Sequence, residues 1–246
     1  MSSEPQTFWD HLDELRNVLI RCLLVIALTA IVAFCFKDTL FNLVLAPRSS
    51  SFISFRMLGL DDGFYLSLMN IGLTEQFMTH MRVAIYAGLL VASPYVLYQL
   101  FGFIAPGLYQ NERHAATWIA TSAYIMFIVG TLVSYLLIFP LTVRFLGTYQ
   151  VSPDVANMLT LQSYIDTLIG MCFVMGVVFE LPVVCTILGK MGLINRKMMS
   201  SFRRHAIVAI LVVSAIITPT TDAFTLLIVA LPIWLLYEVS IILVKN

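Results

Sequence analysis

The sequence predicts an all-α membrane protein with six transmembrane helices, a short extracytoplasmic helical cap, and short fifth and sixth spans. Of the 246 residues, 60% are hydrophobic and only 11% are charged, whereas a soluble domain carries about 25% charged residues. The mean hydropathy is +0.92. The apolar residues also fall into long runs, and a helix needs about 20 of them to cross a bilayer. We interpret residues 1–246 as a single polytopic membrane domain.

Six apolar runs account for the predicted spans. The second run begins near Glu75, with Thr74 as its expected N-cap. The fifth is too short to cross an ordinary bilayer upright, so it either extends through Arg204 by snorkelling or lies where the bilayer is thin. A re-entrant hairpin formed by the last two runs is the alternative. The spans are expected at about residues 18–36, 75–100, 118–140, 164–188, 204–217 and 223–244.

The longest connection between runs extends from Lys37 to about Glu75. Residues 40–45 and 64–68 are apolar enough to form short helices that lie on the outer face of the membrane. Pro47 is expected to end the first of these helices, because the residue before a proline disfavours helical geometry. The connection therefore predicts a small helical cap.

The distribution of Lys and Arg predicts the orientation. If the N-terminus is cytoplasmic, the cytoplasmic segments carry more cations than the outer ones, with the densest cluster between Lys190 and Arg204. The positive-inside rule then places both termini in the cytoplasm. No small-residue cleavage site follows the first run, so a removable signal peptide is not expected.

Composition also excludes several kinds of function. The formal net charge is zero, so the chain lacks the basic footprint of a nucleic-acid-binding protein. No phosphate-binding loop of the Walker type is present, so the chain has no visible means of using ATP. The cysteines lie in or beside apolar runs without C-x-x-C spacing, which favours packing over a disulfide framework or a zinc site. They are Cys22, Cys35, Cys172 and Cys185. No cofactor is expected.

A carboxylate interrupts the fourth run. Glu180 is flanked by Phe179, Leu181 and Pro182, and a charge at the centre of a bilayer costs at least about 2.5–3.5 kcal/mol on insertion scales. The residue must therefore be neutral or paired, and we expect it to mark a functional polar site on a kinked span. The alternative is a protonated acid that is hydrogen-bonded within a helix bundle.

Two further segments carry acids beside predicted spans. The segment from His11 to Arg16 reads HLDELR and places Glu14 at the expected cytoplasmic boundary. It is alternatively the solvated start of a helix, where the helix dipole favours acids. The stretch after the second span stays aromatic and apolar, and it ends at Glu112. Glu112 is alternatively a solvated acid neutralised by Arg113.

Three motifs in order, together with the predicted topology, resemble the TatC family, the multispanning receptor subunit of the twin-arginine protein translocase. The resemblance covers nearly the whole chain. The motifs are His11-x-x-Glu14-Leu15-Arg16, then Ser93-Pro94 through Tyr98-Gln99, Phe103-Ile104-x-Pro106-x-Leu108-Tyr109 and Glu112, and finally Gly176-x-x-Phe179-Glu180-x-Pro182.

The resemblance implies a binding and scaffold subunit and not an enzyme. It implies that Glu14 and Glu112 line the site for twin-arginine signal peptides, with Arg16 in the same motif and with an apolar wall on the helix that runs through Pro94, Phe101 and Phe103. A carboxylate can accept the planar fork of an arginine in bidentate fashion, which a lysine cannot reproduce. The resemblance further implies TatA and TatB as partners, homo- and hetero-oligomers, the bacterial cytoplasmic membrane, and export of folded proteins driven by the proton-motive force.

Weaker matches implied by the resemblance are structural or concern partner contacts. They are Pro47 in the outer cap, Pro94 in the second span and Asp222 in the turn before the last span, while Glu180 matches an intramembrane acid of the family that faces a concave, partly hydrated pocket. The chain departs from the usual family residues at Gln76, Phe101, Gly107 and Leu226.

Two other functions fit parts of the sequence. A proton-coupled transporter could use Glu180 as its carrier, but no internal repeat is evident, and repeats are common in transporter folds. An intramembrane protease needs a serine–histidine pair, a zinc-binding helix or an aspartate pair. The histidines lie near the ends of spans without an obvious nucleophile; they are His11, His80, His114 and His205.

Overall fold

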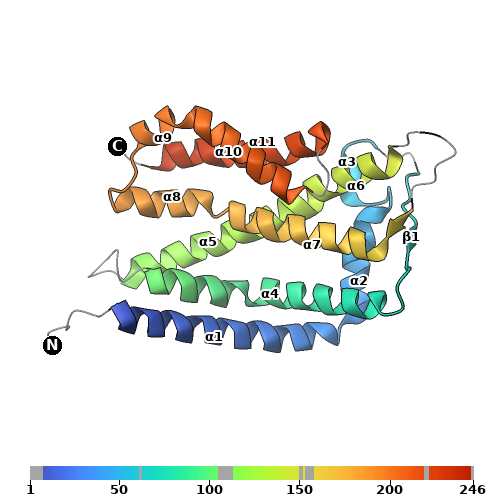
Figure 1. Cartoon of the computed structure of the whole chain (residues 1–246), viewed down its shortest axis with the longest axis horizontal. Helices are drawn as coiled ribbons and strands as arrows, with labels where there is room; N and C mark the ends of the chain where they lie inside the picture. Colours follow the sequence, from blue (N-terminus) through green and yellow to red (C-terminus); the bar gives the residue numbers. More distant parts are fainter. Residues whose placement is uncertain are drawn as a thin grey trace. The chain divides into compact units, whose positions relative to one another are not determined.

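The computed structural model describes residues 8–60, 63–104, 113–149, 152, 158–218 and 222–244. Within these residues the chain is helical, apart from connecting segments and one pair of two-residue strands (Figure 1). The elements in order are α1 (Phe8–Phe34), α2 (Lys37–Leu45), η1 (Ala46–Arg48), α3 (Ile53–Met57), β1 (Leu68–Met69), α4 (Glu75–Ile104), α5 (Arg113–Val133), η3 (Ser134–Ile138), α6 (Phe139–Thr148), β2 (Leu159–Thr160), α7 (Leu161–Val178), α8 (Leu181–Lys190), α9 (Arg196–Ser201), α10 (Arg203–Ile217) and α11 (Ala223–Leu243).

Among the described residues, five helical stretches are long and apolar enough to cross a membrane, judged by length and composition. They match the first four predicted spans and the sixth. α10, the predicted fifth span, has only 15 residues, whereas α11 has 21 and reaches about 30 Å. The predicted shortness therefore holds for α10 but is wrong for α11. The five stretches are Leu12–Phe34, Glu75–Phe103, Thr117–Thr148, Leu161–Lys190 and Ala223–Leu243.

Contacts between Cα atoms group the chain into two compact units. Unit 1 consists of Met1–Leu40 and His80–Tyr124, and unit 2 consists of Phe41–Thr79 and Ile125–Asn246. Each unit is described below by itself. The interpretation of the chain as a single polytopic domain stays a prediction.

In unit 1, α1 and α4 lie side by side (Figure 1). The Thr29 hydroxyl donates a 2.9 Å hydrogen bond to the carbonyl of Gly88. A Cβ atom added to Gly88 would lie 2.5 Å from the backbone nitrogen of Ala30. Glycine thus permits the two backbones to approach closely, as is common in membrane helix pairs. Near the C-terminal end of α1 and the N-terminal end of α4, the rings of Phe34 and His80 stack with centroids 4.0 Å apart.

Pro94 lies inside α4 without ending the helix. Because proline has no N–H, the carbonyl four residues earlier, that of Leu90, loses its helical donor. The hydroxyl of Ser93 donates a 2.7 Å hydrogen bond to this same carbonyl. The Ser-Pro pair therefore restores the lost hydrogen bond locally, which explains how a 30-residue helix tolerates the proline.

Pro140 lies in unit 2 at the start of α6. It follows the π-helical segment η3, which contains the carbonyl of Leu136. The hydroxyl of Ser54 in α3 donates a hydrogen bond to that carbonyl. The third span is longer than predicted: the helical stretch runs to Thr148, beyond the expected end at 140.

The connection between α1 and α4 follows the prediction in its first half. α2 covers the expected helix at residues 40–45, and Pro47 is buried in the following turn η1. The hydroxyl of Tyr135 donates a 2.6 Å hydrogen bond to the carbonyl of Leu43, and that of Tyr164 donates one of 3.2 Å to the carbonyl of Val44. These bonds satisfy carbonyls at the C-terminal end of α2, which lack helical partners.

The prediction of a second cap helix at residues 64–68 is wrong. The chain is extended there, and β1 pairs in parallel with β2, with Leu68 opposite Leu159 and Met69 opposite Thr160. The partner strand lies far away in the sequence, so local apolar character was a misleading signal. A short helix does follow the first one, but it is α3, at Ile53–Met57.

The helix of the fourth span is interrupted at Glu180, where the sequence predicts a kink. α7 ends at Val178, and α8 begins at Leu181 with Pro182 in its first turn. Pro182 cannot donate to the carbonyl of Val178, so the helical ladder is interrupted there.

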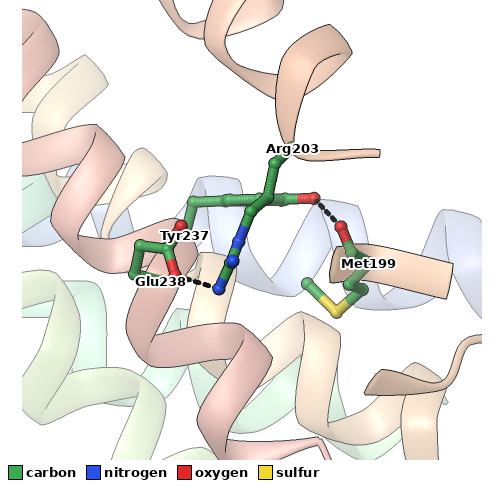
Figure 2. A network of polar contacts seen from close by, with 4 residues as sticks. All are labelled: Met199, Arg203, Tyr237 and Glu238. Carbon is green, nitrogen blue, oxygen red and sulfur yellow. Dashed lines mark hydrogen bonds and ion pairs between the residues drawn. The ribbon is translucent and has the colours of Figure 1, made fainter. Parts of the chain in front are cut away.

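The last helices are joined by a polar network in unit 2 (Figure 2). The guanidinium of Arg203, at the start of α10, lies 2.7 Å from the Glu238 carboxylate of α11. The Tyr237 hydroxyl donates a 2.8 Å hydrogen bond to the carbonyl of Met199 in α9. Met199 itself is buried against Val244 and its neighbours.

Candidate functional site

A groove of about 590 Å³ lies between α1 and α4 within unit 1. Such a volume falls within the range of roughly 300–1,000 Å³ typical of ligand sites. α1 supplies most of its charge, and α4 supplies aromatic and small residues. We call it the α1–α4 groove; its lining residues are Asp13, Glu14, Asn17, Val18, Arg21, Tyr98, Gln99, Gly102 and Phe103.

The lining residues recur at helical spacing on both walls. Glu14, Asn17 and Arg21 lie three and four residues apart on α1, and Gly102 and Phe103 lie four residues after Tyr98 and Gln99 on α4. Residues three and four apart share one face of a helix. Gly102 has no atom within 4 Å of where its Cβ would lie, so the α4 wall is open at this point.

Acids outnumber cations in the lining of the α1–α4 groove. Asp13 and Glu14 contribute carboxylates, and Arg21 contributes one guanidinium. Arg16 lies 3.4 Å from Asp13 in an exposed ion pair one helical turn along. The predicted site residue Arg16 is therefore paired with Asp13 and is not a lining residue, while Glu14 is exposed in the groove. A cationic ligand group would meet this carboxylate.

The predicted apolar wall is present only in part. Phe103 lines the α1–α4 groove, whereas Phe101 is buried and does not. Pro94 lies further back in α4 and acts through the Ser93 hydrogen bond described above. Glu112, the second predicted acid, lies outside the described residues, so its distance from Glu14 stays a prediction.

Glu180 is buried, with 8% of its surface exposed. Among the residues that the structure describes, neither of its carboxylate oxygens has a hydrogen-bond partner. It occupies the residue before α8, where its side chain does not cap the helix. Burying a polar group without a partner is costly, so Glu180 is an unusual position in an otherwise apolar span.

The other predicted structural residues have defined places in unit 2. Asp222 caps α11: its carboxylate accepts a 2.7 Å hydrogen bond from the backbone N–H of Thr225. Pro47 is buried in η1. Asp222 and Pro47 therefore each have a local structural role. Contact with a partner subunit at either residue stays a prediction.

Sequence reasoning missed the role of Glu75. One of its carboxylate oxygens accepts hydrogen bonds from the backbone N–H groups of Ile71 and Gly72, at 3.0 and 2.9 Å. The other accepts one from the N–H of Gln162, at 3.0 Å. Glu75 therefore ties the loop before α4 to the start of α7, and we call this arrangement the Glu75 clamp. Only its place as the first residue of α4 hinted at this role.

A second hollow, of about 490 Å³, lies beside the Glu75 clamp. It is lined by Thr160, Gln162, Ser163, Asp166, Thr167, Gly170 and Ile217. Its one acid among several hydroxyl and amide groups gives it no evident chemistry beyond solvation. Across the described residues, no group of three His, Cys, Asp or Glu side chains is placed to hold a metal ion.

Comparison with known proteins is consistent over the whole chain. The family described as "Sec-independent protein translocase protein (TatC)" matches residues 10–232. The protein of that name from Carboxydothermus hydrogenoformans is 32% identical over 246 residues, covering 100% of this chain and 95% of the relative. The one from Deinococcus radiodurans is 34% identical, covering 99% and 86%. A crystal structure of the "Twin Arginine Translocase Receptor- TatC in DDM" superposes with a TM-score of 0.81 at 31% identity, covering 96% of this chain and 100% of that one.

Proposed function

Because this chain belongs to the family of the Sec-independent protein translocase protein TatC, we propose that it binds twin-arginine signal peptides at the cytoplasmic face of the membrane. In this role it scaffolds TatA and TatB for the export of folded proteins, driven by the proton-motive force. The observation that supports peptide binding is the open, acid-lined α1–α4 groove.

The chemistry of the groove suits an arginine ligand. Glu14 is exposed on the groove wall, and a carboxylate accepts two parallel N–H bonds from a guanidinium. A hydrogen bond to a charged group contributes roughly 1.5–3 kcal/mol. The compact ammonium of lysine lacks the fork geometry. An arginine is therefore preferred over a lysine of the same charge.

The α4 wall suits the part of a signal peptide that follows the arginine pair. Phe103 and Tyr98 present aromatic surface to the groove beside the carboxylates. An apolar peptide segment can pack on these rings while the arginines contact Glu14. We assign Glu112 to the same site, as the acceptor for the second arginine.

Membrane topology and partner contacts complete the proposal. We place the chain in the bacterial cytoplasmic membrane with both termini in the cytoplasm, so that the α1–α4 groove opens toward newly made cargo. Glu180 serves as an intramembrane polar site, and the regions of Pro47 and Asp222 contact partner subunits. The working unit is an oligomer with other copies and with TatA and TatB.

Site-specific photocrosslinking tests the receptor assignment. A photoreactive residue is introduced at position 14 or at position 112 of the full chain, and a signal peptide is added with its arginine pair intact or replaced by lysines. We expect adducts from both positions with the arginine peptide, and a strong decrease with the lysine peptide.

A probe at position 20 provides the control, because Ile20 is exposed on α1 but does not line the groove. It should give little adduct with either peptide. Equal labelling from positions 14 and 20, or equal labelling by the two peptides, would refute the receptor assignment.

A further inference from the structure

A dense set of cations lies where the chain turns from α8 to α10. Residues 190–205 contain no acidic residue, and we call this segment the α8–α10 corner. Its cationic side chains are all exposed: Lys190, Arg196, Lys197, Arg203 and Arg204. None of these residues lines the α1–α4 groove, so the proposed function does not account for them.

The α8–α10 corner is held in a fixed place by its contacts with α11. Met199 is buried with Val244, and its carbonyl accepts the hydrogen bond from Tyr237 (Figure 2). Arg203 pairs with Glu238 at 2.7 Å. Asn195 caps α9 by accepting a 2.8 Å hydrogen bond from the N–H of Met198. These contacts occupy one cation and fix the backbone that carries the others.

Three of the other cations lie on α9 and at the start of α10. Arg196 and Lys197 are adjacent and exposed on α9, and Arg204 is exposed at the start of α10. No acid among the described residues forms an ion pair with any of the three within 4 Å. A cluster of like charges repels itself, so the arrangement is best stabilised by an anionic ligand.

Apolar side chains are exposed among the same cations. Leu193 is 61% exposed and Phe202 is 53% exposed. Exposed apolar residues interleaved with Lys and Arg are typical of segments that lie in the interface of a membrane, where the apolar groups enter the acyl boundary and the cations meet headgroups.

We infer that the α8–α10 corner is a docking site for anionic phospholipids. Arg196, Lys197 and Arg204 contact the headgroup phosphates, while Leu193 and Phe202 enter the adjoining acyl region. Each cation near an anionic membrane surface strengthens binding about fivefold. The apolar residues favour a lipid over a free phosphate ion, because a free ion gains nothing from them.

Lipid titration of the purified full chain in an uncharged detergent tests the inference. The probes are phosphatidylglycerol, phosphatidylcholine and inorganic phosphate. We expect the protein to prefer phosphatidylglycerol over phosphatidylcholine. The double variant Arg196→Gln with Lys197→Gln should bind phosphatidylglycerol about thirtyfold more weakly, and the charge-preserving variant Arg196→Lys should retain binding.

The matched control is Lys37→Gln with Arg56→Gln, which removes one lysine and one arginine that are exposed elsewhere. It should leave phosphatidylglycerol binding unchanged. Should the double variant misfold, Arg204→Gln alone is expected to weaken binding about fivefold. Equal binding of the two lipids, equal losses in corner and control variants, or full displacement of the lipid by inorganic phosphate would each overturn the inference.

Discussion

The Glu75 clamp and the α1–α4 groove use carboxylates in opposite ways. At the clamp, a side chain with 9% of its surface exposed has both oxygens occupied by backbone N–H groups of Ile71, Gly72 and Gln162. In the groove, Glu14 is exposed on the wall of an open hollow. The same functional group thus serves structure in one unit, and in the other it is exposed in a groove that we propose binds the signal peptide.

The difference shows how burial and donors decide the role of an acid. A carboxylate that accepts several backbone N–H bonds is stabilised in its charged form and fixes the groups that donate to it. Glu180 belongs to neither class, because it is buried and has no hydrogen-bond partner among the described residues. Substitutions at these positions should therefore have effects of different size and kind.

The largest loss of stability is expected at the clamp. Glu75→Ala leaves three backbone N–H groups without their acceptor and frees the loop before α4 from the start of α7. The thermal midpoint of the protein in detergent should fall by many degrees, more than for any other variant considered. The thermal midpoint of Glu75→Gln should fall less, because the amide keeps one acceptor oxygen. An unchanged midpoint for Glu75→Ala would show that the clamp has no structural role.

A smaller loss is expected where the groove helices touch. Gly88→Ala places a Cβ 2.5 Å from the backbone of Ala30 and strains the Thr29 hydrogen bond. Overpacking of this kind costs about 1–3 kcal/mol. The thermal midpoint and the affinity for an arginine signal peptide should fall together, since α1 and α4 form the two walls of the groove.

Gly170→Ala is the matched control for Gly88→Ala, because its added Cβ meets no atom within 4 Å. Alanine is favoured over glycine in a helix by about 1 kcal/mol, so this variant should be neutral or slightly more stable. If both glycine variants lost the same stability, close helix contact at Gly88 would not explain the effect.

Glu180→Gln should change stability by less than about 1 kcal/mol. The substitution breaks no hydrogen bond of the described structure, and the amide has nearly the same shape and volume as the acid. Peptide affinity should stay the same, while export in cells should decrease if Glu180 acts as a polar site. Loss of peptide capture by Glu180→Gln alone would place the binding site elsewhere.

The smallest effect is expected at the surface pair of α10 and α11. The Arg203 and Glu238 side chains are 48% and 25% exposed, and pairs of this kind contribute about 0.5 kcal/mol. Arg203→Gln should lower the thermal midpoint only slightly, and raised salt should reduce the difference from the parent protein. A large, salt-independent loss would mean that the pair supports α9 more strongly than its exposure indicates.

Features that depend on neighbours in the sequence were predicted well. The long apolar runs located the helices of membrane-spanning length, and the Glu-x-Pro sequence at residue 180 located the break between α7 and α8. The family was recognised from three short motifs, and the comparison of the whole chain confirmed it.

Features that depend on distant segments were not predicted. The strand at Leu68–Met69 forms because a partner strand lies at Leu159–Thr160, and an apolar stretch alone does not distinguish it from a helix. The hydrogen bond from the N–H of Gln162 to the Glu75 carboxylate likewise joins residues that are far apart in the sequence. Groove residues such as Asn17 and Gln99 were missed because the spacing of residues along a helix predicts which of them share a face. It does not predict which other helix lies opposite that face.

A double-mutant cycle between Glu14 and the signal peptide measures whether this carboxylate contacts a signal-peptide arginine. Dissociation constants are measured for the parent and Glu14→Gln proteins, each with a peptide carrying its arginine pair and with one arginine replaced by glutamine. Asp38→Asn, which removes an exposed acid outside the groove, is the control and should show no coupling. We predict a coupling of about 1.5 kcal/mol between Glu14 and one arginine, roughly tenfold in Kd. A coupling of zero with both arginines would contradict the account.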